Sequence, residues 1–284
     1  MPEGDTIFRA ARTLNRALGG RTVTGFETTL APLAMVNDDT PLVGRTVERV
    51  EARGKWCLIF FSGDLILLTH MRMSGSWHIY KTGERWQAPR SAMRVVITCD
   101  DVQAVGFSIS VAEFHTARSL ERNGQLSELG LDVLSTTYRI DGAARALNDY
   151  GRAHPDAEIG NVLLNQHVIA GIGNVYKSEI AFAAEVNPFR RMQTMSDREL
   201  ERIAEIAQRY MQANVAEGKG EGIVTYGANR QTTRAMDRAA RLWVYRRQGH
   251  ECRRCGAIVE MRRQGTGARS TYWCPSCQPW IESS

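Results

Sequence analysis

The first five residues, Met1-Pro2-Glu3-Gly4-Asp5, place a proline directly before an acid. If Met1 is removed, Pro2 carries a free secondary amine beside the Glu3 carboxylate. An α-amino group has a pKa of about 8, so roughly a tenth of such an amine is neutral at pH 7. A neutral amine can attack carbonyl-type carbon, and a secondary amine then becomes a charged iminium. The alternative is that Pro2 only starts a helix at its first turn, where its missing N–H costs nothing.

Four cysteines near the other end of the chain form two Cys-x-x-Cys pairs with eighteen residues between them. They are Cys252, Cys255, Cys274 and Cys277. Four thiolates at this spacing predict a closed tetrahedral zinc site, which is structural rather than catalytic. His250 is a possible substitute ligand. A disulfide framework is the weaker alternative because we find no secretory signal.

The residues between the cysteine pairs indicate a β-hairpin zinc finger. Segments 260–265 and 270–273 have strand character, and Gly265-Thr266-Gly267 forms the turn between them. Arg269 follows that turn. Because such a finger holds no recognition helix, it cannot read the major groove as a helical finger does, but it could grip the DNA backbone.

A third candidate is Ala170-Gly171-Ile172-Gly173-Asn174, which lies between two expected helices. Glycines in a tight turn expose backbone N–H groups, and these can form an anion site with the N-terminus of the next helix. Asn174 would cap that helix or donate to a phosphate. An ordinary interhelical turn also explains the glycines, but the basic zinc hairpin favours a DNA phosphate.

Length and composition indicate the class of protein. The chain has 284 residues, of which 43% are apolar and 24% charged, as in soluble globular proteins of two domains or one large one. It has no run of eighteen apolar residues and no basic segment followed by an apolar core at its start. We therefore expect no membrane span, no secretory signal and a cytoplasmic, nucleoid-associated location. Cys57 and Cys99 stand alone in apolar runs and should be buried.

The charge is concentrated in one part of the chain. The net charge is +5, with a sequence pI of about 9.0. Residues 230–269 hold eleven arginines and three acids, a net +8, so the remainder carries −3. A basic region on a nearly neutral body predicts a polyanionic partner, most often nucleic acid.

The expected elements would position these residues. Residues 3–18 form an amphipathic helix that ends at Gly19-Gly20, and its N-terminus would suit a phosphate or a developing anion. From residue 21 to about 110, alternating apolar runs predict an antiparallel β-sandwich or barrel-like module with this helix packed on it. Two polar tips interrupt the strands, Arg53-Gly54-Lys55 and the segment 70–75. A lone lysine at such a tip is usually only solvated.

Helical patterns are expected from about residue 112. We expect helices at 143–149, 157–166, 174–184 and 197–216, the last capped by Ser196, with a linker at 150–155. Residues 223–240 are polar and basic and are assigned to no element, and the role of residues 226–241 stays open. The fold class is therefore α+β with two domains: an N-terminal antiparallel β-sandwich and a C-terminal helical domain ending in the zinc hairpin. The expected boundaries are 1–135, 150–240 and 241–284.

Four of these motifs together resemble the bacterial formamidopyrimidine-DNA glycosylase/endonuclease VIII family. They are Pro2-Glu3-Gly4, Gly54-Lys55, residues 166–176 (QHVIAGIGNVY) and residues 267–278 (GARSTYWCPSCQ). The resemblance implies a helix-two-turn-helix domain in the C-terminal half and DNA bound between the two domains. It also implies a base-excision DNA glycosylase with AP-lyase activity, which binds damaged DNA as a monomer and holds one structural zinc ion.

The resemblance assigns a role to each candidate residue. Pro2 would attack C1′ of the damaged nucleotide, and Glu3 would protonate the sugar and shuttle protons, so that β- and δ-elimination cut the strand on both sides. Met73 stands where the family has a residue that fills the gap in the duplex, although it could be only a surface methionine. The expected phosphate contacts are Lys55, Gly171, Gly173, Asn174 and Arg269. Extruding the base before cleaving its glycosidic bond would require such contacts.

Two departures place the chain nearer the endonuclease VIII-like branch. It continues Gly4-Asp5-Thr6 after Glu3, and Val105-Gly106-Phe107-Ser108-Ile109 lacks the arginine that the formamidopyrimidine branch carries there. Oxidised pyrimidines such as thymine glycol and dihydrouracil are then the expected lesions. The alternatives are a glycosylase specific for 8-oxoguanine and formamidopyrimidine, or a non-catalytic zinc-containing DNA-binding protein.

Overall fold

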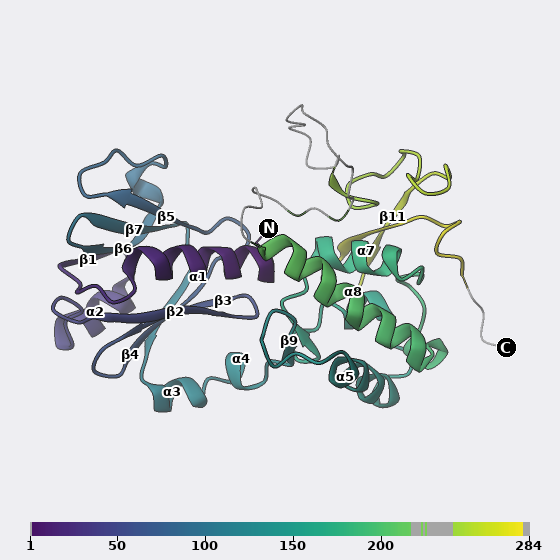
Figure 1. The fold of residues 1–284 in the computed structure, drawn as a ribbon, viewed down its shortest axis with the longest axis horizontal. Coiled ribbons are helices and arrows are strands. Elements are labelled where there is room, and N and C mark those ends of the chain that lie inside the picture. The colour runs from purple at the N-terminus through teal and green to yellow at the C-terminus, as the bar shows by residue number, and fades with distance from the viewer. Residues whose placement is uncertain (1, 217–222, 224, 226–240, 281–284) are drawn as a thin grey trace. The chain divides into compact units, whose positions relative to one another are not determined.

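The computed structural model describes residues 2–216, 223, 225 and 241–280. The chain divides into two compact units, Met1–Glu128 and Leu129–Ser284 (Figure 1). Of the segment 223–240, which the sequence left unassigned, residues 224 and 226–240 lie outside the described residues. None of the described helices combines the length and the apolar character needed to cross a membrane.

Unit 1 contains two four-stranded antiparallel sheets, with strand orders β1-β6-β7-β5 and β2-β3-β4-β8. The strands of the first sheet are β1 (Gly25–Thr28), β5 (Ser76–Lys81), β6 (Met93–Cys99) and β7 (Val102–Phe107). The strands of the second are β2 (Val47–Arg53), β3 (Trp56–Phe61), β4 (Leu65–His70) and β8 (Val111–His115). The predicted N-terminal antiparallel module is confirmed.

Both sheets and helix α1 (Gly4–Leu18) share one apolar core. Successive side chains of a strand point to opposite faces, so Cys57, Ile59 and Phe61 of β3 enter this core together. Helix α1 contributes Ile7, Ala11, Leu14 and Leu18. Cys57 and Cys99 are buried as predicted, and burial raises the pKa of Cys57 to about 12, so this thiol stays neutral at physiological pH.

Two elements of unit 1 differ from the sequence prediction. Helix α2 (Ala31–Asp39) buries only Leu33, so it has little amphipathic pattern to detect. The expectation of helical patterns from residue 112 is wrong for β8, which pairs with β4 and completes the second sheet. The short elements η1 (Arg90–Ala92), α3 (Ala117–Glu121) and α4 (Gly124–Ser127) complete the unit.

Unit 2 is mainly helical. Its longer helices are α5 (Ile140–Ala153), α7 (Asn174–Ala183) and α8 (Asp197–Val215). Its short elements are α6 (Ile159–Val162), η2 (Met192–Thr194), and the parallel strands β9 (Leu131–Asp132) and β10 (Ile169–Ala170). The predicted cap of α8 is confirmed: Ser196 and Glu199 form a capping box, in which the Glu199 carboxylate accepts from Ser196 N–H at 2.8 Å.

Two expectations for unit 2 are wrong. Residues 150–153 belong to α5 rather than to a linker, because Tyr150 packs on the helical core and Gly151 lies against Met192. The helix expected at 157–166 is reduced to α6, since Ile159 N–H and Gly160 N–H donate to carbonyls of the loop after α7.

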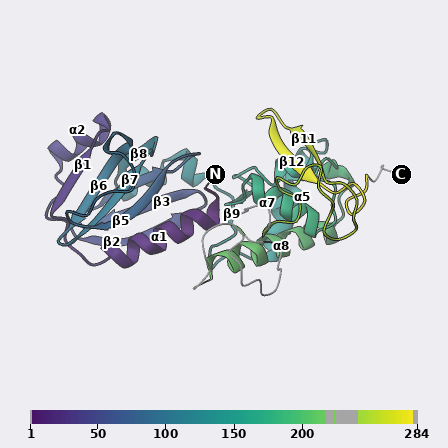
Figure 2. The ribbon, with the colours of Figure 1, turned by 90° about the horizontal axis from the view of Figure 1, so that it is seen from above.

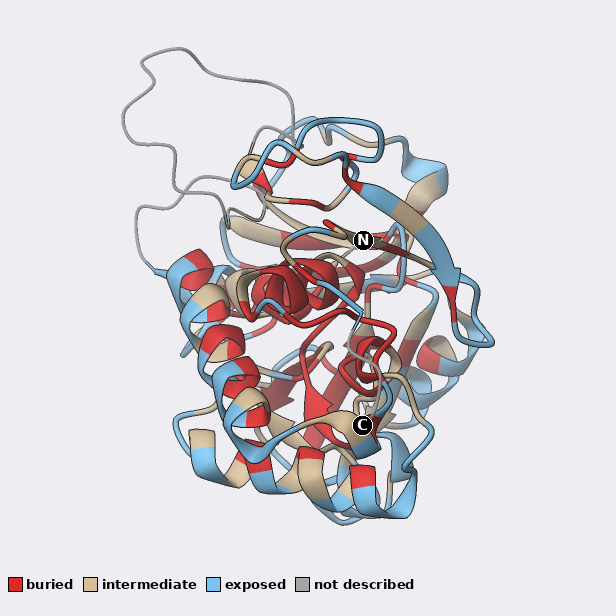
Figure 3. Ribbon diagram, turned by 90° about the vertical axis from the view of Figure 1, so that its right-hand side faces the viewer, coloured by how far each residue is buried: buried red, intermediate tan, exposed pale blue. Residues whose placement is uncertain are grey.

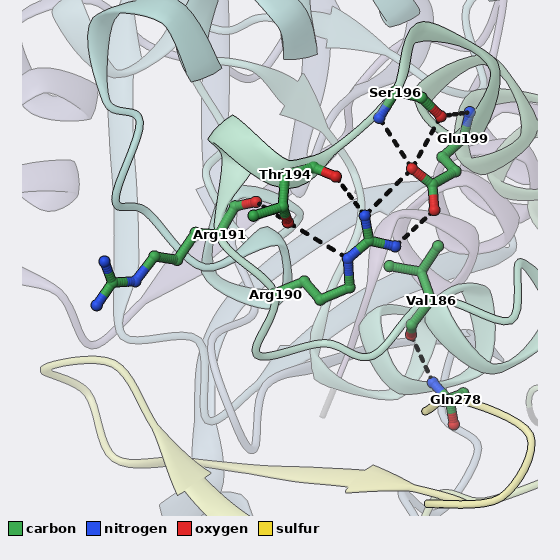
Figure 4. Close-up of polar contacts among 7 residues, drawn as sticks. All are labelled: Val186, Arg190, Arg191, Thr194, Ser196, Glu199 and Gln278. Carbon is green, nitrogen blue, oxygen red and sulfur yellow. Dashed lines mark hydrogen bonds and ion pairs between the residues drawn. The ribbon is translucent and has the colours of Figure 1, made fainter. Parts of the chain in front are cut away.

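A buried arginine holds the connection between α7 and α8 (Figure 4). Arg190 is 4% exposed, and its Nη1 lies 2.5 Å from Glu199 Oε1. Its Nη2 also donates to the carbonyl of Thr194. At the start of the same connection, the carbonyl of Val186 accepts from Gln278 Nε2 at 2.7 Å. This hydrogen bond attaches the end of the cysteine region to the helical domain. A paired buried charge of this kind specifies one geometry for the loop.

The zinc-finger region contains the predicted hairpin, formed by β11 (Glu260–Gln264) and β12 (Arg269–Trp273) (Figure 2). Helix α7 is buried along almost its whole length (Figure 3) and serves two cores. Tyr176 and Ile180 enter the helical core, whereas Phe182 packs with Cys252 and Cys274 of the finger. Helix α7 therefore joins the helical domain to the finger.

Candidate active site and nucleic-acid interface

Glu3 and Pro2 lie at the start of α1. Glu3 is the N-cap residue, with φ −115° and ψ −179°, and its carbonyl accepts from Ile7 N–H at 3.1 Å. The Glu3 side chain is fully buried, while Pro2 is half-buried. In the first turn, Asp5 Oδ2 lies 3.1 Å from Arg9 Nη2. The acids therefore lie at the positive end of the helix dipole, which stabilises negative charge.

Two hydrogen bonds show that α1 and β2 run in opposite directions. Val50 N–H donates to Asn15 Oδ1 at 2.7 Å, and Gly20 N–H donates to Val47 O at 2.8 Å. Asn15 within the helix thus meets Val50, whereas Gly20, just after the helix, meets the earlier strand residue Val47.

This geometry brings the start of α1 to the turn after β2. From Asn15 back to Gly4 the helix rises about 16 Å. From Val50 forward to Arg53 the strand covers about 10 Å in the same direction, and the Gly54-Lys55 turn follows it. Pro2, Glu3 and Lys55 therefore lie at the same end of unit 1.

The loop after β4 belongs to this end as well, because His70 pairs with Trp56, the residue after Lys55. His70 Nδ1 accepts from Arg72 N–H at 2.9 Å, which leaves the proton of the neutral ring on Nε2. Burial, followed by the positive charges of Arg72 and Lys55, lowers the pKa of His70 to about 4. His70 is therefore a neutral donor above pH 5.

The same loop has a tight backbone. Arg72 adopts a left-handed φ of 51°, and Gly75 N–H donates to Met71 O at 2.8 Å. A Cβ at Gly75 would lie 2.5 Å from that carbonyl oxygen, so the turn requires glycine. Met71 is buried and Met73 is 63% exposed, so the loop presents Met73 to solvent. The β7–β8 connection, by contrast, contains Ser108 and buried Ile109 and no arginine.

In unit 2, the Gly171–Gly173 loop leads into the N-terminus of α7, whose N-cap is Gly173. Gly171 has φ 100°, and its N–H donates to Gln166 Oε1 at 3.0 Å. This amide is thus used inside the loop, and the role of Gly171 is to allow the turn rather than to donate outward. The first-turn N–H groups of α7 have no acceptor within the helix itself.

Asn174 and the residue after Arg269 are in direct contact. Asn174 Nδ2 donates to Ser270 O at 2.8 Å, and Asn174 is 6% exposed. Its buried Oδ1 has no partner among the described residues. Arg269 begins β12, opposite Gln264, and is exposed. Unit 2 therefore brings Asn174 and Arg269 together, while Pro2, Glu3, Lys55 and Met73 all belong to unit 1.

The four predicted metal ligands form one group. The sulfur atoms of Cys252, Cys255, Cys274 and Cys277 lie within 4.8 Å of one another, and His250 is not part of the group. The Cys252–Cys277 and Cys255–Cys274 distances are 3.9 and 3.5 Å. Tetrahedral zinc with Zn–S bonds of about 2.3 Å requires edges of about 3.8 Å, so the group fits zinc.

The surroundings of this group also suit a metal. The backbone N–H of Ala257 is the main cause that lowers the pKa of Cys255 to about 6. Cys277 N–H donates to Cys274 Sγ at 3.5 Å, an outer contact that orients a ligand. Four protein ligands leave no open position, so the metal would stabilise the fold and carry out no chemistry.

Several residues that matter to the site were missed in the sequence. Glu179 of α7 accepts from the N–H groups of Trp243, Val244 and Tyr245 at 2.8, 3.0 and 2.8 Å, and from the Thr225 hydroxyl. Lys177, also on α7, is fully buried. The available signal was the presence of charged residues in a helix whose other positions are apolar or small.

Comparison with known proteins identifies the family. Residues 1–119 match the model of the formamidopyrimidine-DNA glycosylase N-terminal domain, residues 129–225 that of its H2TH domain, and residues 249–279 a zinc finger found in FPG and IleRS. A probable endonuclease 8 2 from Streptomyces coelicolor is 37% identical over 98% of this chain and 94% of its own length. This chain belongs to the formamidopyrimidine-DNA glycosylase/endonuclease VIII family. The resemblance seen in the motifs is thereby confirmed.

Further members of the family agree in sequence and fold. The DNA-(apurinic or apyrimidinic site) lyase Nei2 of Mycolicibacterium smegmatis is 34% identical over 98% of this chain and 99% of its own length. Lactococcus lactis Fpg, solved in complex with DNA containing an oxidised pyrimidine, superposes with a TM-score of 0.80 at 20% identity. That match covers 98% of this chain and 100% of the other, and it shows the family fold.

Proposed function

We propose that this protein is a bifunctional DNA glycosylase/AP lyase that removes oxidised bases, with pyrimidines preferred, through an iminium formed on Pro2. The neutral amine of Pro2 attacks C1′, and the glycosidic bond breaks as the base leaves with the electron pair and takes up a proton. Protonation of O4′ by Glu3 opens the sugar ring and leaves C1′ as an iminium.

The iminium then drives strand cleavage. It acidifies the C2′ proton, and loss of that proton expels the 3′ phosphate in a β-elimination. A second proton loss expels the 5′ phosphate in the δ-elimination. Hydrolysis of the remaining iminium releases the sugar fragment as an aldehyde and restores the amine.

The placement of Pro2 and Glu3 is the observation that carries this proposal. They lie at the N-terminal end of α1, at the same end of unit 1 as Lys55 and the Met73 loop. Glu3 is fully buried beside the half-buried Pro2, so its carboxyl group is shielded from bulk water. This combination is unnecessary for a protein that only binds DNA.

Phosphate contacts would hold the extruded nucleotide. We assign them to Lys55 in unit 1 and, in unit 2, to Arg269 and to Asn174, the first residue of α7. An arginine can bind a phosphate through two parallel hydrogen bonds, whereas lysine contributes a point charge.

The preference for pyrimidines rests on the β7–β8 connection and on the relatives. No arginine lies between Phe107 and Val111 to enter the duplex opposite the lesion. The relatives at 37% and 30% identity are named endonuclease 8. We expect thymine glycol in duplex DNA to be excised faster than 8-oxoguanine opposite cytosine. Equal rates for the two substrates would overturn this preference, and faster excision of 8-oxoguanine would favour the 8-oxoguanine-specific alternative.

We also propose that one zinc ion binds per chain and that the protein acts as a monomer. One four-cysteine group is present among the described residues, and it provides four ligands for one tetrahedral ion.

Borohydride trapping tests the catalytic proposal. Reduction of the iminium by borohydride should link the protein covalently to DNA that contains dihydrouracil or an abasic site. Pro2→Gly should reduce the yield, and protein that retains Met1 should give no adduct because its proline nitrogen is an amide. Intact mass must therefore show that the active protein begins at Pro2. If such protein binds the DNA but gives no adduct, the non-catalytic alternative is correct.

A further inference from the structure

We propose that Lys177 is a positioning residue that, through Thr271, holds strand β12 so that Arg269 and Asn174 form one phosphate-binding edge. This inference rests on the phosphate-binding role proposed above for Arg269. It assigns a role to a charge that the catalytic mechanism does not use.

Lys177 carries its charge in a fully buried environment. It lies in the middle of α7, its side chain is 0% exposed, and Thr271 beside it is also 0% exposed. Lysines are almost never fully buried unless polar groups compensate their charge. Lys177 Nζ donates to Thr271 Oγ1 at 2.6 Å, across 94 residues of sequence.

This contact is the middle one of a series. Residues at positions i, i+3 and i+4 of a helix share one face. Three such residues of α7 each bind one of three consecutive residues of β12. The pairs are Asn174 Nδ2 with Ser270 O at 2.8 Å, Lys177 Nζ with Thr271 Oγ1 at 2.6 Å, and Ser178 Oγ with Tyr272 N–H at 3.3 Å. Because Arg269 directly precedes these residues, α7 determines its position.

The chemistry of the side chains determines which group donates and which accepts in these hydrogen bonds. An ammonium group can only donate, so the Thr271 hydroxyl accepts from Lys177 and donates to Gln264 Oε1 at 2.8 Å. Gln264 Nε2 then donates to Glu158 Oε2 at 2.9 Å. The chain thus runs from a cation to a carboxylate, and hydrogen bonds in such a chain strengthen one another.

The chain also holds the other strand of the hairpin. Gln264 is 3% exposed and is the cross-strand partner of Arg269. Its Nε2 donates further to Pro188 O at 2.8 Å, in the loop after α7. Both backbones beside Arg269 are therefore attached to the helical domain through groups that begin at Lys177.

Loss of the lysine should act on DNA binding through the hairpin. Lys177→Met keeps a long apolar side chain but removes the donor that orients Thr271. If Arg269 is displaced and loses its hydrogen bond to the phosphate, the affinity should fall about tenfold or more, as for other hydrogen bonds to charged groups. We expect binding of a duplex with a tetrahydrofuran abasic-site analogue to weaken about tenfold in Lys177→Met. Lys177→Arg, which keeps the donor, should restore most of the affinity.

A double-mutant cycle with Arg269→Ala tests whether Lys177 acts through the arginine. The four proteins are the wild type, each single variant and the double variant, with zinc content measured for each. If the proposal holds, Lys177→Met weakens binding in the wild-type background but adds almost nothing in the Arg269→Ala background. A full tenfold loss in both backgrounds would overturn it, because a general loss of stability does not depend on Arg269.

Two further results complete the test. Arg269→Ala that binds as tightly as the wild type would show instead that the phosphate role of Arg269 is wrong. If Lys177→Met does not keep its zinc, Thr271→Val and Thr271→Ser replace it as a matched pair. Only Thr271→Val removes the hydroxyl, so it alone should weaken binding in an Arg269-dependent manner, and equal affinities of the two variants would overturn the proposal.

Discussion

Salt should separate the charged from the neutral members of the proposed phosphate contacts. Lys55 and Arg269 each bring a full positive charge, whereas Asn174 brings a neutral amide. Each phosphate neutralised on duplex DNA contributes about 0.9 to the slope of log affinity against log salt concentration. Lys55→Ala and Arg269→Ala should each make this slope shallower by about 0.9. Asn174→Ala should weaken binding at every salt concentration without changing the slope.

The size of the effect follows from the two charges. Between about 50 and about 200 mM KCl, a variant that lacks one phosphate contact should lose about 3.5-fold less affinity than the wild type. Because each neutralised phosphate contributes separately to the slope, the losses of Lys55 and Arg269 should add. Over the same range of salt concentration, the double variant should therefore lose about twelvefold less affinity than the wild type.

Fluorescence anisotropy with a labelled tetrahydrofuran duplex measures these slopes. Arg145→Ala is a matched control, because Arg145 is an exposed arginine of α5 that pairs with Asp141 at 2.6 Å and is not one of the proposed contacts. The control should keep the wild-type slope. Wild-type slopes in both Lys55→Ala and Arg269→Ala would refute the assignment, as would a change of about 0.9 in Asn174→Ala.

Three further predictions concern stability, zinc and the duplex gap. The folded state lowers the pKa of His70 from 6.5 to about 4, so the unfolded state binds more protons between these values. The free energy of unfolding should therefore fall as the pH falls through this window. Urea melts should show a smaller fall in His70→Gln, and an equal fall would contradict the assignment. Cys274→Ser should lower the zinc content below about one ion per chain and weaken DNA binding, as metal analysis with anisotropy can check. Met73→Ala should weaken binding to an abasic duplex more than to an abasic single strand, whereas equal losses would mark Met73 as a surface methionine.

The elements that the sequence predicted best have strong local signals. Helix α8 has a capping box at Ser196 and an apolar stripe over its full length, and the structure begins it at Asp197 as expected. The hairpin β11–β12 was predicted from its turn glycines and from the cysteine pairs around it. Both signals act within a few residues, so no tertiary context was needed to detect them.

Elements that depend on distant partners were predicted less well. β8 forms a strand because β4 offers it an edge, although the segment itself carries a mixed pattern. The end of α5 looked like a linker because it holds Tyr150, Gly151 and a following His154-Pro155. Packing against the helical core and Met192 extends the helix to Ala153.

The sequence by itself determined the chemistry available to this protein: a proline and an acid at the start of a helix, four thiols at zinc spacing, and basic residues in separate motifs. Residue type and local spacing are enough for that, because they decide which bonds a side chain can make. Only the tertiary structure decided which groups meet. It brought Lys55 to the N-terminal end of α1 and joined Lys177 to Thr271 across 94 residues. Such contacts form between segments far apart in the chain, and no local pattern encodes them.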